Sequence, residues 1–247
     1  LHDFRLIAEK TKSFNLEQQV LVMECTFKTM DGNFEEVFRI GEEIDARGEQ
    51  AGTANTTRAF SSIGRIHANT YLGLSTEFSE ETSRTFEGRV NICGVVAHQG
   101  QNEEASKVIE RYVINRKNFN TDEDLMPTFV DMTFLEASVL IGHSQASEML
   151  YNRLNGTDVC TGGIRIVSCL ARLLGGAAAL LERHDDAREH YKEAIRVCTD
   201  MRFRPELALS RLGLAELLLD QYPDEKAEAL EHLDFAINEF REMKMQP

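Results

Sequence analysis

The chain has 247 residues, 42% of them hydrophobic and 28% charged, a balance typical of a soluble folded protein. Acidic residues outnumber basic ones by 41 to 27, and the net charge of −14 disfavours nucleic acid and anionic membranes as partners. No apolar run approaches the ~20 residues of a membrane span, and the five cysteines form no CxxC motif. We therefore expect a cytoplasmic protein with reduced cysteines, most of them buried, and with no metal or cofactor.

Apolar residues recur at every third or fourth position along most of the chain, which predicts helices, and no strand with period two is found. The fold class is therefore predicted as all-α. The first 14 residues read as the end of a helix, and polar loops are predicted at 48–55 and 115–122. The other predicted helices cover 16–30, 34–46, 56–72, 86–98, 103–113, 124–141, 145–154, 161–183, 185–199, 204–219 and 224–243.

The clearest helix pair lies between Leu170 and Cys198. A turn is predicted at His184-Asp185-Asp186, where acidic side chains stabilise the positive end of the following helix. Small, large and small residues follow at Ala187, Tyr191 and Ala194, so a neighbouring helix can approach closely on both sides of the aromatic ring. Gly175 is interpreted as a packing residue of the same kind.

This stripe repeats along the chain. Its first small position falls at Val37, Ala105, Ala146, Ala187 and Ala229, with spacings of 68, 41, 41 and 42 residues. The first spacing holds two units of 34, and an irregular unit around 56–86 fills it. Two helices in each unit of 34 to 42 residues predict an α-solenoid. We expect about six helical hairpins in a right-handed superhelix, which form one repeat domain over 1–247.

The units resemble the tetratricopeptide repeat family. Its pattern is a large and a small residue in the first helix, then Ala, a large residue and Ala in the second. The matching residues are Leu174, Gly175, Ala187, Tyr191 and Ala194, then Leu212, Gly213, Ala229, Leu233 and Ala236, and more loosely Ile92, Cys93, Gly100, Ala105 and Ile109.

A narrower resemblance lies near the end of the chain, at Met201–Glu206, Leu212–Leu217 and Phe240–Met243. These segments look like the C-terminal repeats of bacterial multidomain signalling proteins, which carry an adenylate or guanylate cyclase or a MalT-like regulatory ATPase. The resemblance implies a non-catalytic regulatory module within a longer chain, and we expect any enzymatic activity to lie outside these residues.

Such a module is expected to bind a protein or peptide partner on its concave face. Another domain of the same polypeptide could supply that partner, and self-association is left open. The outward positions of the first helices give the candidate contacts: Ser61, Arg65, Asn69, Glu87, Val90, His98, Arg172, Gly176, Ser210 and Leu214. For the last unit an alternative remains, in which a continuation of the chain covers Leu214 and its neighbours, because terminal repeats need a cap.

The alternative function is a small-molecule sensor that regulates an attached cyclase, ATPase or transcription regulator. A polar pocket lined by aromatic residues would favour it, and Tyr71, His98 and Tyr112 are its candidates. The group formed by His184, the two aspartates after it and His190 is interpreted as a turn and helix start, because the two histidines share no helix face. With no nucleophile–base pair in view, the chain is not expected to be an enzyme.

Overall fold

The computed structural model describes residues 1–163 and 168–246. Within them the fold is all-α, as predicted, and the only extended pairing is an isolated bridge between Thr161 and Cys169. The helices are α1 (His2–Thr11), α2 (Phe14–Met30), α3 (Phe34–Gln50), α4 (Ala54–Tyr71), α5 (Glu80–Arg84), α6 (Phe86–His98), α7 (Asn102–Ile109) with a π-helical end η1 (Glu110–Ile114), α8 (Thr128–Leu140), α9 (Ser144–Leu154), α10 (Leu170–Leu180), α11 (His184–Asp200), α12 (Arg204–Gln221) and α13 (Lys226–Met243), the last preceded by a 3₁₀ turn η2 (Pro223–Glu225).

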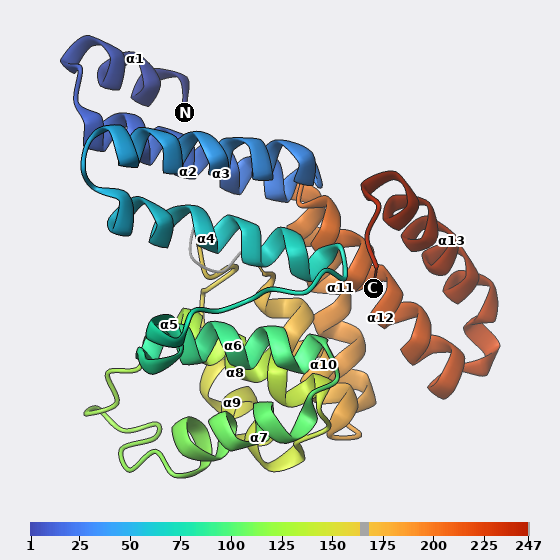
Figure 1. Ribbon diagram of the computed structural model, residues 1–247. Coiled ribbons are helices and arrows are strands. Elements are labelled where there is room, and N and C mark those ends of the chain that lie inside the picture. Colours follow the sequence, from blue (N-terminus) through green and yellow to red (C-terminus); the bar gives the residue numbers. More distant parts are fainter. Residues whose placement is uncertain (164–167, 247) are drawn as a thin grey trace.

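Among the consecutive helices that pack against each other are α2 with α3, α6 with α7, α8 with α9, α10 with α11, and α12 with α13 (Figure 1). Helix α3 also packs on α4, and α11 on α12. Short turns join the helices of each pair. In the turn between α2 and α3, Gly32 has φ of 71°, a left-handed conformation that costs glycine nothing. The five pairs named first are the hairpins that the periodic pattern predicted.

Within the range of the irregular unit predicted around 56–86, the helices are interrupted. After α4 the chain runs without helix through 72–79, and the only helix before α6 is the single short turn of α5. The hydroxyl of Ser79 caps α5 by accepting a hydrogen bond from the backbone N–H of Thr82. As a result α4 has no full-length second helix after it.

The first helices of successive units are in contact, from α2 through α4, α6, α8 and α10 to α12, and α12 contacts α2 again. Residues after α13 add to this contact between the two ends of the helix series. The backbone N–H of Gln246 donates to the carbonyl oxygen of Tyr71 at the end of α4, with an N···O distance of 2.9 Å. Met245 is buried in one core cluster with Tyr71 and Phe240. The N-terminal and C-terminal parts of the chain are therefore joined directly, as Figure 1 shows for the C-terminus beside α4.

Tyr191 packs between two helices at their glycines. A Cβ atom at Gly175 would lie 2.8 Å from its ring, and one at Gly213 would lie 2.5 Å from it. Both distances are shorter than real Cβ contacts, so α10 and α12 approach the ring only because these positions lack a side chain. The interpretation of Gly175 as a packing residue is confirmed.

All five cysteines are free thiols, and four of them are buried, which confirms the prediction; Cys160 is exposed.

Two predicted helices begin later than expected. The helix predicted from residue 124 begins at Thr128. The carboxylate of Asp124 accepts hydrogen bonds from the backbone of Asn120 and Met126, and Met126 precedes Pro127, which disfavours helical backbone. The helix predicted from residue 161 begins at Leu170. Gly163 has φ of 72°, and Thr161 pairs with Cys169 instead; 164–167 of that prediction lie outside the described residues.

Two predicted turns are also corrected. The loop predicted at 48–55 shrinks to three residues, because the missing side chain at Gly48 lets α3 run on against Thr57 of α4. The turn predicted at His184-Asp185-Asp186 lies three residues earlier, at 181–183, and α11 already begins at His184. Both aspartates stand in its first turn.

Candidate functional site

A cavity of about 280 Å³ lies between α4, α6, α8, α10 and α12, and the C-terminal residues close one side of it. We call it the central cavity. Its polar lining is His67, Thr70, Tyr71, His98, Glu136, Ser168, Arg172, Tyr191, Glu216 and Gln246, and its other lining residues are Val139, Leu140, Leu173, Gly176, Leu209, Leu212, Gly213 and Met245. Helices from both halves of the chain therefore contribute to one space.

An ion cluster centred on Arg172 lies at this cavity. The guanidinium Nε donates to Oε2 of Glu206 at 2.6 Å, and Nη2 donates to Oε1 of Glu136 at 2.6 Å. Glu206 is fully buried and also accepts hydrogen bonds from the hydroxyl of Tyr71 and the backbone N–H of Cys169. Four helix segments distant in sequence thus meet at Arg172 and Glu206. A buried carboxylate with this many donors is firmly held in place.

Charge pairing sets the protonation of this cluster. Burial by itself raises the pKa of Glu136, but the charge of Arg172 and a contact from His98 lower it well below its ordinary value. Burial likewise lowers the pKa of Arg172, but the carboxylates of Glu206 and Glu136 raise it well above its ordinary value. Near neutral pH both groups are charged.

The hydroxyl of Tyr191 and the carboxylate of Glu216 are among the lining groups without a hydrogen-bond or ion-pair partner in the described residues. The first is the hydroxyl of Tyr191, whose side chain is 8% exposed. Burial raises its pKa to about 12, so the hydroxyl stays protonated. The second is the carboxylate of Glu216, an exposed side chain one helical turn after Leu212 and Gly213 on α12. Burial beside Asp220 raises the pKa of Glu216.

The structure brings three of the ten predicted contact residues to the central cavity: His98, Arg172 and Gly176. Ser210 and Leu214 are buried in the packing of α12, and the described chain itself covers them. On α12 the stripe that lines the cavity is Leu209, Leu212, Gly213 and Glu216. The rotation of the helix about its axis, which the repeat pattern does not specify, accounts for this difference.

The other five predicted contact residues lie elsewhere. Ser61 and Arg65 both bond to the carboxylate of Asp45 on α3, with distances of 2.6 and 2.8 Å. The amide of Asn69 donates to the hydroxyl of Thr76. Val90 is buried in the core, and Glu87 is exposed at the start of α6.

Of the three residues predicted for a small-molecule pocket, Tyr71 and His98 line the central cavity. Tyr112 instead stacks on Phe134 and meets the edge of Phe86.

Sequence reasoning missed Glu136, Glu206 and Glu216. Glu206 follows Pro205 at a helix start, where an acidic residue ordinarily faces solvent and interacts with the helix dipole. A charged residue within an otherwise apolar helix is the one signal available for Glu136, in the run Phe134-Leu135-Glu136-Ala137.

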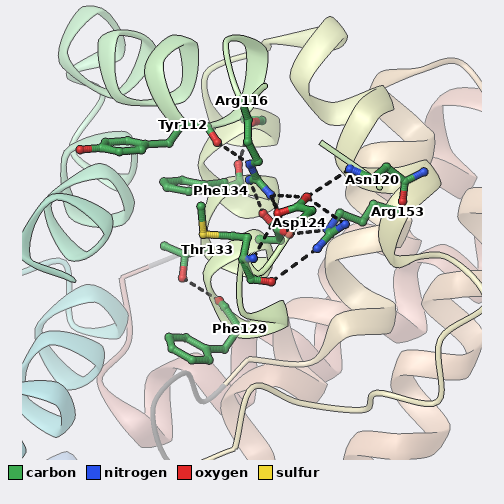
Figure 2. A network of polar contacts seen from close by, with 11 residues as sticks. Tyr112, Arg116, Asn120, Asp124, Phe129, Thr133, Phe134 and Arg153 are labelled. Atoms are coloured by element: carbon green, nitrogen blue, oxygen red, sulfur yellow. Dashed lines mark hydrogen bonds and ion pairs between the residues drawn. The ribbon is translucent and has the colours of Figure 1, made fainter. Parts of the chain in front are cut away.

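A second buried ion cluster stabilises the loop before α8. Figure 2 shows Arg116 and Arg153 approaching Asp124 from different sides. The two arginines also bond to Asp131, which is fully buried, at 2.6 Å each. Arg153 stands where the repeat pattern calls for a small residue. The structure gives its role, which is to connect α9 to the loop at 115–127.

The described residues contain no group of three or more His, Cys, Asp or Glu side chains placed to hold a metal ion. His184, Asp185, Asp186 and His190 are thus not gathered into such a group, and Asp185 accepts a hydrogen bond from the hydroxyl of Tyr222. Across the described part of the chain, every helix is too short or too polar to cross a bilayer.

Comparisons of the chain with protein-family models, curated proteins and solved structures find no match.

Proposed function

We propose that this chain is a non-catalytic regulatory module that senses a small molecule in its central cavity. In this proposal the helix pairs are a solenoid of the tetratricopeptide type, and the module acts on domains attached to it. The observation that carries the proposal is the cavity itself, a lined space formed where the two halves of the chain meet. Its volume of about 280 Å³ suits a small molecule.

The mechanism depends on which helices line the cavity. Part of the lining belongs to α4, and another part belongs to α10 and α12. A ligand that touches both parts binds the closed arrangement better than an opened one. It therefore shifts the population towards closure by as much as its affinity differs between the two states.

The test is a thermal-shift screen of metabolites, followed by hydrogen exchange on each hit. A true ligand should raise the melting temperature and slow amide exchange in α4 and α12 together. Gly176→Val should abolish both effects, because a Cβ atom at Gly176 would stand 3.2 Å from Val139 and 3.7 Å from the hydroxyl of Tyr191, inside the cavity. Gly94→Val, in α6 and away from the cavity lining, is the matched control and should keep them. Hits that survive Gly176→Val, or that protect other helices, would contradict the proposal.

A second candidate, binding of a polypeptide on the inner face, is favoured by one observation. Residues after α13 already lie there, with Met245 buried and the backbone of Gln246 bonded to Tyr71. A labelled peptide covering 241–246 should therefore bind to a chain shortened to residue 243. The same peptide with Met245→Asp should not bind, and equal binding of the two peptides would rule this candidate out.

A further inference from the structure

The central cavity has an excess of negative charge. Glu136 and Glu216 line it, and Glu206 lies behind Arg172. Arg172 is the one Arg or Lys among the described residues of the lining, and its Nε and Nη2 are engaged by Glu206 and Glu136. With the histidines counted as neutral, three carboxylates therefore face one guanidinium. An anionic ligand would meet repulsion here, and a cationic one would meet attraction.

Two of the lining groups without partners can accept hydrogen bonds from a cation. Tyr191 is more than nine-tenths buried and lines the cavity, and its hydroxyl has no partner among the described residues. The exposed side chain of Glu216 lines the same space. Burial raises the pKa of Tyr191, the charge of Arg172 lowers it, and the charge of Glu216 raises it. A carboxylate only accepts hydrogen bonds, and a tyrosine hydroxyl can accept one, so an ammonium group with three N–H donors satisfies both.

The rest of the wall is apolar. Val139, Leu140, Leu173, Leu209, Leu212 and Met245 line the remainder of the cavity. Such a surface favours a hydrocarbon body, and together with the polar end it matches the usual character of small-molecule sites.

From this arrangement we infer that the ligand of the central cavity is a small organic amine. Its ammonium group bonds to Glu216 and to the hydroxyl of Tyr191, and its alkyl or cycloalkyl body lies on the leucine wall. Arg172 is a positioning residue, which holds Glu136 and Glu206 in place. The inference rests on the proposed sensing function and specifies the class of ligand.

The test measures binding of probes that differ only in the charge of one end. n-Butylammonium and cyclohexylmethylammonium are each compared by calorimetry with the alcohol and the carboxylate of the same carbon skeleton. The unaltered chain should bind at least one amine about tenfold or more tightly than its alcohol, because a hydrogen bond to a charged group is worth more than one between neutral groups. The carboxylate should not bind.

Three variants locate the binding. Glu216→Gln should lose about tenfold or more in affinity for the amine and none for the alcohol. Tyr191→Phe should lose less, because the partner removed is neutral. Glu189→Gln, whose side chain is 77% exposed on α11, is the matched control and should bind like the unaltered chain. Circular dichroism and melting temperature check that each variant is folded.

The two proposals fail in different ways. If an alcohol or carboxylate binds as tightly as its amine, or Glu216→Gln binds the amine normally, the amine assignment is overturned and the sensing function stands. If no probe binds and the metabolite screen also yields no ligand for the cavity, both are overturned.

Discussion

Several single residues with unusual surroundings hold the helices of this fold together. Gly175 and Gly213 are conspicuous because their missing side chains make room for one ring, that of Tyr191. Glu206 is conspicuous for the opposite reason, because its charged side chain is fully buried and accepts hydrogen bonds from Arg172, Tyr71 and Cys169. Substitutions at these residues should therefore change the free energy of unfolding by amounts that helix propensity alone would not predict.

Gly213→Ala should destabilise the chain by about 1–3 kcal/mol, because the new Cβ atom would lie 2.5 Å from the ring of Tyr191. In an open helix the same change would stabilise by about 1 kcal/mol. Gly94→Ala in α6 is the control, since its nearest neighbour is the methyl group of Thr133 at 3.2 Å. Urea unfolding measures both. Equal stability of the two variants would show that the ring yields without cost.

Glu206→Gln should lower the free energy of unfolding by about 3–5 kcal/mol, because it leaves the charge of Arg172 buried with one partner fewer. Glu242→Gln is the matched control, since Glu242 pairs with Arg204 at the surface and is 67% exposed. Its loss should be only about 0–1 kcal/mol. Chemical denaturation compares the two, and similar losses would contradict a central role for Glu206.

At the scale of elements, the stretch between η1 and α8 depends on ion pairs more than on helical hydrogen bonds. Asp124 and Asp131 are held by Arg116 and Arg153, and the guanidinium groups of both arginines lie over the ring of Phe119. Backbone hydrogen bonds to Asp124 complete the arrangement. The loop is thereby ordered against α8 and α9 without a helix of its own.

Arg153→Met should release this loop. Asp131 would keep Arg116 but lose its bond to α9, so amide exchange at 115–127 should accelerate while α10 to α13 stay protected. Lys117→Met, an exposed change within the same loop, should leave exchange unaltered. Hydrogen exchange with mass spectrometry resolves the segment. Uniform acceleration across the chain would mean that the cluster supports the whole fold instead.

For the whole molecule, the decisive feature is the return of α12 to α2 and of the C-terminal residues to α4. Without it the inner surface would be an open groove. With it, helices from both halves of the chain and the C-terminal residues line the central cavity. Contacts distant in sequence therefore determine the shape of this space.

Met245→Ala should weaken this closure. Met245 is 5% exposed in a core cluster with Tyr71, and its truncation should cost about 2–5 kcal/mol. Faster amide exchange in α4 should accompany the loss. Met201→Ala, at a position 36% exposed, is the control and should change little. If α4 stays protected in Met245→Ala, the C-terminal residues do not maintain the closure.

Acid should destabilise the molecule through the same cluster. The pKa of Glu136 is below its ordinary 4.5 in the folded chain, so the unfolded chain takes up protons first as the pH falls. The stabilisation is complete above the ordinary value and is lost as the pH falls towards the folded one. Urea titrations between pH 7 and pH 3 should show stability falling below about pH 4.5. Glu136→Gln should make that fall shallower, and an unchanged slope would assign it to other carboxylates.

The sequence by itself determined the helices, most of their turns and the packing role of Gly175, because periodicity and turn residues act over a few neighbours. It also pointed to Tyr71 and His98 as pocket residues. Only the tertiary structure decided which side of α12 faces inward, that Glu206 is buried, and that helices from both halves of the chain line one cavity. The physical reason is that each of these depends on contacts between residues more than a hundred positions apart, such as Tyr71 with Glu206. The local pattern of apolar and turn residues contains no information about which distant helices will pack together.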